Sequence, residues 1–596
     1  MGDVMMPVGA TAQIDNRSIS YGHLVLQDGR RWLCFRDPIH VFAAYEPQDV
    51  TYYLAEIEKA VERQGLYAAG FMSYEAGAAY GLDVHGRDSA DLPLLWFGLY
   101  DRPYESAPPN ISNAACDLGQ WQANLDQKAY FAAVEQIKNH IVDADTYQVN
   151  FTMRMRTQFA GDSWALFCEL SQAQQAAHTA FLDLGRYAIC SASPELFFRL
   201  EGDLLTARPM KGTARRGLTL AEDKAQIARL RSSTKDRAEN VMIVDMIRND
   251  FGRVAQIGTV QVPQLFTVER YPTLLQMTST VKARSTASLP DIMAAMFPCA
   301  SITGAPKVRT MQIIKSLEPE PRGIYTGTIG YFGPERRASF NVAIRTVVID
   351  RDTGQADYGV GSGIVWDSKA AEEYAECRLK SRVLVQRWPS FELLESILWT
   401  PEEGFFLLDL HLQRLAESAE YFGYPFKAQS IRLHLMKLSE KLVGPRKVRL
   451  LLANDGALTS KVNSLADGAK LEPVRVDLAA TPVNASEIWL YHKTTHRQVY
   501  DEALNSRQHG DEVILWNERG EITEASGANV VVELNGRLVT PPVTAGLLAG
   551  TYRRYLLEQG LISEEPVTIA ELKRSPQLFL INSVRKWRKA VYIESG

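Results

Sequence analysis

The chain is poor in cysteine, and its cysteines form no motif. Six are scattered over 596 residues, and no two stand in a Cys-x-x-Cys pair. This spacing excludes a zinc ribbon or a dense disulfide framework and is typical of buried thiols in a reducing compartment. We therefore expect free thiols at Cys34, Cys116, Cys168, Cys190, Cys299 and Cys377.

Long apolar runs and an excess of positive charge are missing as well. No apolar run approaches the ~20 residues that a membrane-spanning helix needs. The opening residues lack the basic and apolar regions of a secretory signal. The formal net charge is −5, and no basic cluster is interleaved with aromatic residues. The sequence thus predicts a soluble cytoplasmic enzyme that binds neither nucleic acid nor a membrane.

A chain of 596 residues is too long for one hydrophobic core, so we expect several domains. A stretch rich in Pro, Ser and Asn at 103–113 reads as a connection. A second boundary is predicted near 389, where Trp388-Pro389 precedes a new strand. The predicted domains are 1–388, made of a variable part at 1–115 and a catalytic part at 120–385, and 390–596.

One lysine of the catalytic part lies in an unusual setting, at the centre of Arg208-Pro209-Met210-Lys211-Gly212-Thr213. Pro209 fixes its own φ and Gly212 permits backbone angles that other residues avoid, which predicts a defined turn around Lys211. A partly desolvated lysine loses its proton near neutral pH and acts as a nucleophile. Most lysines are solvated surface charges, so this interpretation depends on the acidic motifs that accompany Lys211.

Those acidic motifs lie on both sides of the lysine. Glu195 follows Pro194 and precedes apolar residues, which favours a buried general acid; an exposed turn glutamate is the alternative. Two helices, predicted over 235–250 and 372–380, carry further carboxylates. Carboxylates that converge from two helices are typical of a Mg²⁺ site, and two solvated, salt-bridged helices are the alternative.

A glycine-rich segment and an arginine lie between these two predicted helices. Gly359-Val360-Gly361-Ser362-Gly363 predicts a turn whose backbone N–H groups face an anion. Arg345, on a strand predicted over 341–346, carries the fork that grips a carboxylate. The glycine spacing is not that of a dinucleotide-binding loop. The segment therefore predicts an anion site without a nucleotide.

Together these segments resemble the chorismate-utilising enzymes: anthranilate synthase component I, isochorismate synthases and aminodeoxychorismate synthase component I. The similarity covers about residues 120–385 through SASPELF, RPMKGT, KDRAENVMIVDMIRNDFGRV, SITGAPK, GIYTGTIGYFG, FNVAIRT, GVGSGIVWDS and EEYAECRLK. Lys211 discriminates within the family, because anthranilate and isochorismate synthases carry alanine there and aminodeoxychorismate synthases carry lysine.

The resemblance implies that Lys211 adds to C2 of chorismate and expels the C4 hydroxyl, with Glu195 as the acid, before ammonia adds at C4. A glutamine amidotransferase subunit would supply the ammonia, because the chain has no Gly-x-Cys-x-Gly elbow. Where much of the family has histidine, this chain has Gln276, which does not titrate. The implied Mg²⁺ ligands are Glu239 and Glu376 with Glu373 close by, and the implied substrate contacts are Thr213, Arg345, Gly361, Ser362, Gly363 and Lys380.

The C-terminal part offers a lysine, an acid and two glycine-bearing turns. Lys493 is predicted at a strand end and Glu524 on a strand, and the turns lie at 526–529 and 547–551. This set suits pyridoxal 5'-phosphate: the lysine binds the cofactor, the acid keeps the pyridine nitrogen protonated, and the turns hold phosphate. Each of these residues taken alone is more often structural or solvated.

The same part resembles the fold-type IV pyridoxal-phosphate enzymes through HLQRLAESA, HKTTHR, ITEASGANV and LLAGTYR, over about 390–596. The resemblance implies Lys493 as the cofactor lysine, Glu524 as the pyridine partner, and Arg414, Ser526 and Thr551 as phosphate contacts. The motifs separate aminodeoxychorismate lyases poorly from aminotransferases. Whether the chain forms a homodimer through this part stays open.

The expected fold is α+β, with an N-terminal sandwich of β-sheets flanked by helices and a C-terminal fold-type IV enzyme of two α/β subdomains. The expected function is two-step synthesis of 4-aminobenzoate for folate, because a lyase best explains fusion to such a synthase. Two alternatives stay open. One is an anthranilate- or isochorismate-type synthase fused to a branched-chain or D-amino-acid aminotransferase; the other is a regulatory protein that binds these ligands without turnover.

Overall fold

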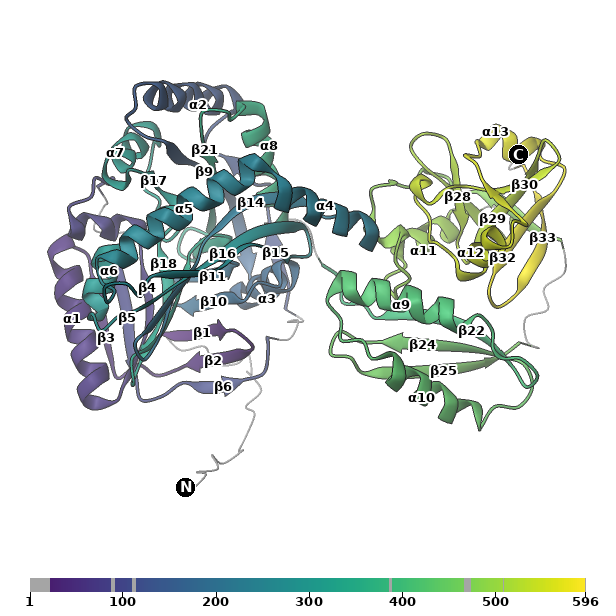
Figure 1. The fold of residues 1–596 in the computed structure, drawn as a ribbon, viewed down its shortest axis with the longest axis horizontal. Helices are drawn as coiled ribbons and strands as arrows, with labels where there is room; N and C mark the ends of the chain where they lie inside the picture. The colour runs from purple at the N-terminus through teal and green to yellow at the C-terminus, as the bar shows by residue number, and fades with distance from the viewer. Residues whose placement is uncertain are drawn as a thin grey trace. The chain divides into compact units, whose positions relative to one another are not determined.

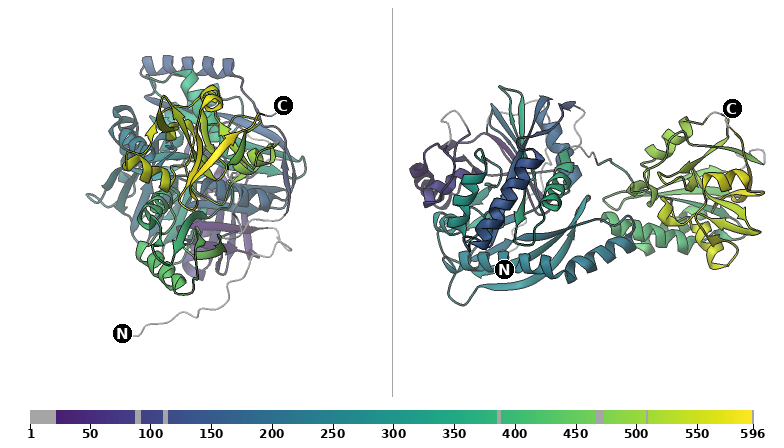
Figure 2. Two further views of the ribbon diagram at one scale, coloured as in Figure 1. Left: turned by 90° about the vertical axis from the view of Figure 1, so that its right-hand side faces the viewer. Right: turned by 90° about the horizontal axis from the view of Figure 1, so that it is seen from above.

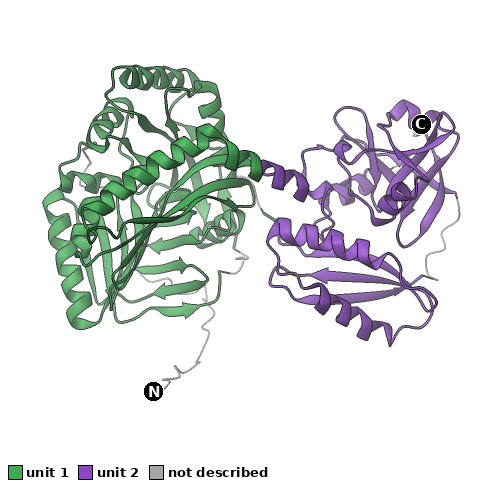
Figure 3. Ribbon diagram, viewed as in Figure 1, with its two compact units in different colours: residues 1–215, 227–388 green, residues 216–226, 389–596 purple. Residues whose placement is uncertain are grey.

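The computed structural model describes residues 22–86, 92–109, 114–384, 388–465, 473–507 and 509–594. The predicted absence of a secretory signal concerns opening residues that lie outside this range. The strands and helices gather into two compact units (Figures 1, 2 and 3). Unit 1 comprises 1–215 and 227–388, and unit 2 comprises 216–226 and 389–596. No helix of the described residues is long and apolar enough to cross a membrane.

Two large antiparallel sheets form the centre of unit 1. The strands of sheet A are β1 (His23–Asp28), β2 (Arg31–Phe35), β6 (Tyr104–Ser106), β7 (Cys116–Leu118), β8 (Gln122–Ala123), β9 (Gln148–Gly161), β10 (His178–Asp183), β11 (Tyr187–Ser193), β17 (Gly304–Ala305), β20 (Thr346–Asp350) and β21 (Gln355–Ile364). Their order is β17-β9-β21-β20-β11-β10-β1-β2-β6, with β7 and β8 also paired to β9. The long strands β9 and β21 therefore lie side by side.

Sheet B carries the lysine motif at one edge. Its strands are β3 (His40–Ala44), β4 (Tyr67–Met72), β5 (Leu95–Tyr100), β12 (Leu196–Glu201), β13 (Leu204–Arg208), β14 (Met210–Arg215), β15 (Gln261–Arg270), β16 (Leu274–Arg284), β18 (Thr328–Gly333) and β19 (Arg337–Val342). Their order is β14-β16-β13-β12-β19-β18-β4-β5-β3, with β15 paired to β16.

Unit 1 is layered, because apolar side chains fill three spaces. Leu24 and Phe35 of sheet A meet Phe71 and Trp96 of sheet B in a core between the sheets. On sheet B pack α1 (Pro47–Gln64), α5 (Thr234–Gly252) and α6 (Leu289–Met296). On sheet A pack α2 (Gln127–Val142), α3 (Ser163–Gln174), α7 (Lys307–Leu317) and α8 (Ala370–Ser381). The expected sandwich of sheets flanked by helices is confirmed.

Local sequence determines one helix start, whereas the crossing between the two sheets differs from its prediction. Asp126 caps α2, since its carboxylate accepts a hydrogen bond from the Ala129 N–H at 2.7 Å. The strand predicted over 341–346 is wrong. Strand β19 ends at Val342 in sheet B, and β20 begins at Thr346 in sheet A. Between them Arg345 adopts a left-handed φ of 53°, which turns the chain from one sheet to the other.

Unit 2 contains two subdomains, as expected for its class. The smaller has β22 (Leu393–Thr400), β23 (Gly404–Phe405), β24 (Arg446–Leu452), β25 (Leu458–Ser464), α9 (Leu408–Phe422) and α10 (Ala428–Ser439). The larger has β26 (Val474–Leu478), β27 (Glu512–Trp516), β28 (Ile522–Ala525), β29 (Ala528–Leu534), β30 (Arg537–Thr540), β31 (Ser563–Glu564), β32 (Leu578–Asn582), β33 (Lys586–Tyr592), α11 (Gln498–Asn505), α12 (Thr551–Glu558) and α13 (Ile569–Arg574). Each subdomain has its own sheet.

A short segment from the first part of the sequence packs within unit 2. Residues 216–226 include the start of α4 (Leu220–Ser232). The Tyr421 hydroxyl donates to the Gly217 carbonyl at 2.7 Å, and the Arg216 guanidinium donates to the Tyr421 carbonyl at 2.8 Å. Arg216 also pairs with the buried Asp223 at 2.7 Å. These contacts anchor the segment to α9.

Candidate active sites

Lys211 lies in a cavity of about 460 Å³ in unit 1. The predicted turn around it is wrong, because Lys211 belongs to strand β14 at the edge of sheet B. The pairing of β14 with β16 shifts register between Met210 and Thr213, and Gly212 takes a φ of 92°. The glycine therefore makes a bulge in a strand, and a bulge re-aims the neighbouring side chains. Burial lowers the pKa of the Lys211 ammonium.

Gln276 holds this bulge in place. Its side-chain amide donates to the Gly212 carbonyl at 3.0 Å, and its amide oxygen accepts from the Thr213 hydroxyl at 3.2 Å. Gln276 and Thr213 both line the cavity. Because Gln276 does not titrate, its contacts can position the strand beside Lys211 but cannot transfer a proton.

Glu195 faces the same cavity from the connection between β11 and β12. Its side chain is buried, as its apolar flanks predict, with 3% of the residue exposed. Its Oε1 atom has no hydrogen-bond partner among the described residues. Burial raises the pKa of this carboxyl group to about 7. A carboxylic acid with that pKa keeps a proton to donate near neutral pH.

The three predicted metal-binding carboxylates also line this cavity, Glu239 from α5 and Glu373 and Glu376 from α8. Each has a partner of its own: Glu376 pairs with Lys380 at 2.7 Å, Glu373 accepts from the Ser368 hydroxyl at 2.7 Å, and Glu239 lies 4.0 Å from the Lys235 ammonium. No three acidic, His or Cys side chains within the described ranges stand together as a metal cluster. The donor atoms suit Mg²⁺, but they are not gathered around one point.

The glycines of GVGSG lie on strand β21 and not on the predicted turn. They are needed because other groups approach the strand closely. A Cβ atom on Gly363 would lie 2.7 Å from the Lys211 Nζ, and one on Gly361 would lie 2.5 Å from the Phe151 carbonyl oxygen. Both glycines line the cavity. Ser362, between them, is fully buried, and its hydroxyl lies 3.0 Å from the Tyr130 hydroxyl.

Two cations complete the wall that was predicted to bind substrate. The Lys380 ammonium donates to the Gly361 carbonyl at 2.9 Å. Arg345 is buried, with 8% of the residue exposed, and its guanidinium donates to the side-chain oxygen of Gln174 at 2.5 Å. Both line the cavity, so unit 1 brings Lys380 and Arg345 together with Lys211 and Glu195.

Sequence reasoning missed Gln148, the first residue of β9. Its side chain is fully buried, and neither amide atom has a hydrogen-bond partner within the described residues. A Cβ atom on Gly363 would lie 2.9 Å from its Nε2 atom, so Gln148 and Lys211 approach the same point of β21. The only signal in the sequence was a polar residue at the start of an apolar strand.

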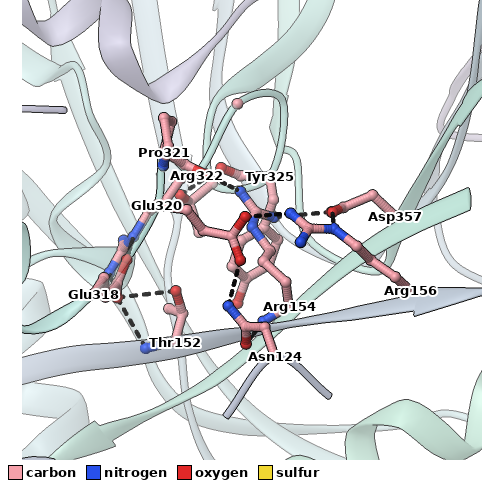
Figure 4. A network of polar contacts seen from close by, with 12 residues as sticks. Asn124, Thr152, Arg154, Arg156, Glu318, Glu320, Pro321, Arg322, Tyr325 and Asp357 are labelled. Atoms are coloured by element: carbon pink, nitrogen blue, oxygen red, sulfur yellow. Dashed lines mark hydrogen bonds and ion pairs between the residues drawn. The ribbon is translucent and has the colours of Figure 1, made fainter. Parts of the chain in front are cut away.

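A buried polar network supports the cavity wall (Figure 4). Arg322 and Glu318 form a bidentate pair at 2.8 and 2.6 Å. Glu318 accepts from the backbone and the hydroxyl of Thr152, both at 2.9 Å, and Arg322 donates to the Asn150 carbonyl at 2.7 Å. Asn150 lines the cavity. The pair thus fixes β9 where it borders the site, and loss of one partner would leave a buried charge unpaired.

Unit 2 has a separate cavity of about 330 Å³, and Lys493 lies in its wall. The prediction of a strand end is wrong: Lys493 lies in an irregular segment whose carbonyl accepts from the Leu394 N–H at 2.9 Å. This bond ties Lys493 to the start of β22 in the smaller subdomain. Burial, followed by the nearby charge of Arg414, lowers the pKa of the Lys493 ammonium to about 7.

Glu524 lies on strand β28, as predicted, and faces the same cavity. One carboxylate oxygen accepts from the Tyr500 hydroxyl at 2.8 Å and from the Leu548 N–H at 3.0 Å, and the other from the Asn529 side chain at 3.3 Å. Burial raises the pKa of Glu524 to about 7. Such a carboxyl group shares a proton readily with a basic nitrogen.

The predicted phosphate contacts Arg414, Ser526 and Thr551 line this cavity too. Arg414 forms a bidentate pair with Glu395 at 2.9 and 2.7 Å, a residue that the sequence did not single out. Burial raises the pKa of Glu395, but the charges of Arg414 and His411 outweigh it and hold the pKa at about 2. An amine of low pKa, a buried acid and a fixed arginine around one cavity fit pyridoxal phosphate.

Comparison with known proteins agrees with this division. Residues 22–386 match the family of chorismate binding enzymes, and residues 392–593 match class IV amino-transferases. Anthranilate synthase component I from Streptococcus pneumoniae TIGR4 has the same fold over 65% of this chain and 98% of that chain, with a TM-score of 0.52 and 23% identity.

Curated relatives carry related names. Aminodeoxychorismate synthase component 1 of Escherichia coli (strain K12) is 42% identical over 269 residues, which are 45% of this chain and 59% of that protein. Anthranilate synthase component 1 of Cereibacter sphaeroides is 37% identical over 288 residues, 48% of this chain and 57% of that protein. The chain thus spans less than two thirds of the length of these relatives. Because the family match covers more than half of its residues, the chain belongs to the chorismate-binding enzymes.

Proposed function

We propose that the chain makes 4-aminobenzoate in two steps: amination of chorismate in unit 1 and pyruvate elimination in unit 2. The observation that carries the proposal is the pairing, in each unit, of a lysine of lowered pKa with a buried glutamate of pKa about 7. The name of the Escherichia coli relative supports the first step. Lys211 also favours amination at C4 over an anthranilate- or isochorismate-type reaction, because the synthases of those types carry alanine at this position.

In unit 1, the neutral Lys211 amine adds to C2 of chorismate while the C4 hydroxyl departs. Glu195 donates its proton to that hydroxyl, which leaves as water. Ammonia then adds at C4, and the lysine leaves C2, so the product is 4-amino-4-deoxychorismate. Arg345 and Lys380 bind the substrate carboxylates, and Gln276 keeps the bulge of β14 aligned so that Lys211 points at C2.

In unit 2, pyridoxal phosphate would supply an electron sink when it is bound. Lys493 would bind it, Arg414, Ser526 and Thr551 would hold its phosphate, and Glu524 would hold a proton at its pyridine nitrogen. The substrate amine would take the place of Lys493, and the freed Lys493 amine would then remove the proton from C4 of 4-amino-4-deoxychorismate. The C3–O bond breaks, enolpyruvate leaves and takes up a proton to become pyruvate, and the ring becomes aromatic. Because aromatisation is strongly favourable, this step draws the first one forward.

The decisive experiment is incubation of the pure chain with chorismate, Mg²⁺, ammonium and pyridoxal phosphate, followed by identification of the aromatic product. We expect 4-aminobenzoate and pyruvate in equal amounts. Glutamine in place of ammonium should give no product until a glutamine amidotransferase subunit is added, because the chain has no nucleophilic-cysteine elbow. Anthranilate as the product would refute the proposal.

Mg²⁺ is expected to be necessary for the first step only. Glu239, Glu373 and Glu376 would hold it, and its charge would offset that of a substrate carboxylate. EDTA should abolish chorismate consumption and leave conversion of supplied 4-amino-4-deoxychorismate unchanged. Glu376→Gln should lower the rate of the first step by about 10²-fold or more, and Glu135→Gln, exposed on α2, should not. Undiminished amination in EDTA would contradict the metal assignment.

Gly363→Ala should impair the first step without unfolding unit 1. The added methyl group would lie 2.7 Å from the Lys211 Nζ, so the amine must move away. A displacement of about 1 Å at a reacting group lowers catalysis by about 10²-fold. Chorismate consumption and the thermal midpoint are measured together. Gly252→Ala is the matched control, since its methyl group meets nothing within 4 Å; equal rates for both variants would refute the close approach.

A further inference from the structure

The cavity of unit 2 has more positive charge than the cofactor needs. Besides Arg414 and the proposed cofactor lysine Lys493, four basic side chains line it: Lys447, Arg449, Arg497 and Arg585. None of these four has a carboxylate within ion-pair distance among the described residues, whereas Arg414 is already paired with Glu395. A phosphate ester carries about two negative charges. At least two of these four positive charges are therefore left for something else in the cavity.

Two of these cations, Lys447 and Arg449, lie side by side on strand β24. Lys447 and Arg449 are two residues apart on β24, so their side chains lie on the same face of the sheet, while Val448 between them is fully buried on the other. The Nε atom of Arg449 is buried and has no hydrogen-bond partner in the described part of the chain.

The third cation approaches from the larger subdomain. Arg585 follows β32, where the Asn582 side chain accepts from the Arg585 N–H at 2.8 Å and donates to the Gly527 carbonyl at 3.1 Å. Burial, and then the charges of Arg449, Arg585 and Arg497, lower the pKa of Lys447. Lys447, Arg449 and Arg585 thus form one cluster, which we call the cation cluster.

Like charges that gather without acids destabilise the free protein unless an anion joins them. The substrate of an apolar amino-acid aminotransferase carries a single carboxylate and would leave part of the cluster unpaired. A site built to bind charged groups rejects a ligand that lacks them. A surplus of at least two positive charges fits a substrate with two carboxylates.

We infer that the cation cluster of Lys447, Arg449 and Arg585 is a substrate subsite that selects a ring dicarboxylate at the Lys493 centre. The inference rests on the proposed function and deepens it. The product of unit 1, 4-amino-4-deoxychorismate, has one carboxylate on its ring and one on its enolpyruvyl ether. Glutamate is the alternative ligand. It also has two carboxylates, but on an open chain, so the two ligands share their charge and differ in shape.

The test is calorimetric binding to the full chain loaded with pyridoxal phosphate, and it needs no turnover. Isophthalate, glutarate and benzoate are the probes. Isophthalate should bind at least about 10-fold more tightly than benzoate, since its second carboxylate makes a charge-assisted hydrogen bond that benzoate lacks. It should also bind more tightly than glutarate. Preference for glutarate would assign the cluster to an open-chain dicarboxylate and overturn the inference.

Variants of the cation cluster test whether it binds the dicarboxylate. Arg449→Met and Lys447→Met should each weaken isophthalate binding by about 10- to 100-fold, and Arg449→Lys, which keeps the charge, should retain most of it. Lys437→Met, exposed on α10 and outside the cavity, is the control for loss of one charge. The cofactor absorbance per chain should stay at the parent level in all of them. If Arg449→Met lost the cofactor, the cluster would serve the phosphate, and the inference would be wrong.

The same chains separate this inference from the proposed function. With supplied 4-amino-4-deoxychorismate, Arg449→Met should raise KM by about 10- to 100-fold and change kcat by less than about 3-fold. A parent chain that released no pyruvate would refute the proposed function, while calorimetry would still report on the cluster. If the parent chain released pyruvate but Arg449→Met kept the parent KM and the parent affinity for isophthalate, only the assignment of the cation cluster as a substrate subsite would be refuted.

Discussion

Lys493→Ala should stop the synthesis of 4-aminobenzoate and let 4-amino-4-deoxychorismate accumulate. The variant loses the amine that binds the cofactor and moves the C4 proton, so the second step should fall by about 10³-fold or more. Unit 1 keeps its own cavity, lysine and acid, so chorismate consumption should continue at the parent rate. Chromatography of chorismate–ammonium mixtures measures both steps, and pyruvate should stay far below the amount of chorismate consumed.

The controls for this variant separate chemistry from folding. An independent 4-amino-4-deoxychorismate lyase added to the mixture should restore 4-aminobenzoate. Lys573→Ala, an exposed lysine of α13 that pairs with Glu594, should behave as the parent. The variant should also lose the absorbance of the lysine-bound cofactor. If Lys493→Ala formed 4-aminobenzoate at the parent rate, unit 2 would not be the site of the second step.

Lys211→Ala should have the opposite pattern, because it removes the nucleophile of the first step. Amination should fall by at least about 10³-fold, because the variant lacks the amine that is proposed to add to C2. Added lyase should not rescue it, because no intermediate is formed. Supplied 4-amino-4-deoxychorismate should still give 4-aminobenzoate at the parent rate. These two measurements assign the loss to unit 1.

A matched control for Lys211→Ala is Lys315→Ala. Lys315 lies on α7, its side chain is 42% exposed, and its partner Asp83 is exposed as well, so the exchange removes a charge that lines neither candidate site. Surface changes of this kind alter stability by less than about 0.5 kcal/mol. Amination by Lys211→Ala at a rate near that of Lys315→Ala would show that the lysine is not a nucleophile.

The architecture was predictable from the sequence because it depends on local patterns. The helices predicted over 235–250 and 372–380 are present as α5 and α8. The family resemblance also named side chains that share a cavity, since Lys211, Glu195 and Glu376 line one and Lys493, Glu524 and Arg414 the other.

Predictions failed where the backbone conformation depends on strands distant in sequence. Gly212 and Gly363 suggested turns, yet the first makes a bulge against β16 and the second lets β21 approach Lys211. Glycine permits both choices, and only the pairing partner decides between them. Gln148 and Glu395 were missed for a related reason: their burial is set by distant segments, and neither residue type predicts it alone.

The anchoring of residues 216–226 in unit 2 has a consequence for how the chain is divided. A cut at 389 would separate the two family matches cleanly in sequence, but the C-terminal fragment would lack Arg216 and Gly217, and Tyr421 would lose both bonds to that segment. The second family match therefore lacks a segment that packs within the same compact unit. Gene fission would have to be accompanied by repair of the α9 surface, whereas a transplanted second enzyme would have to carry residues 216–226 with it.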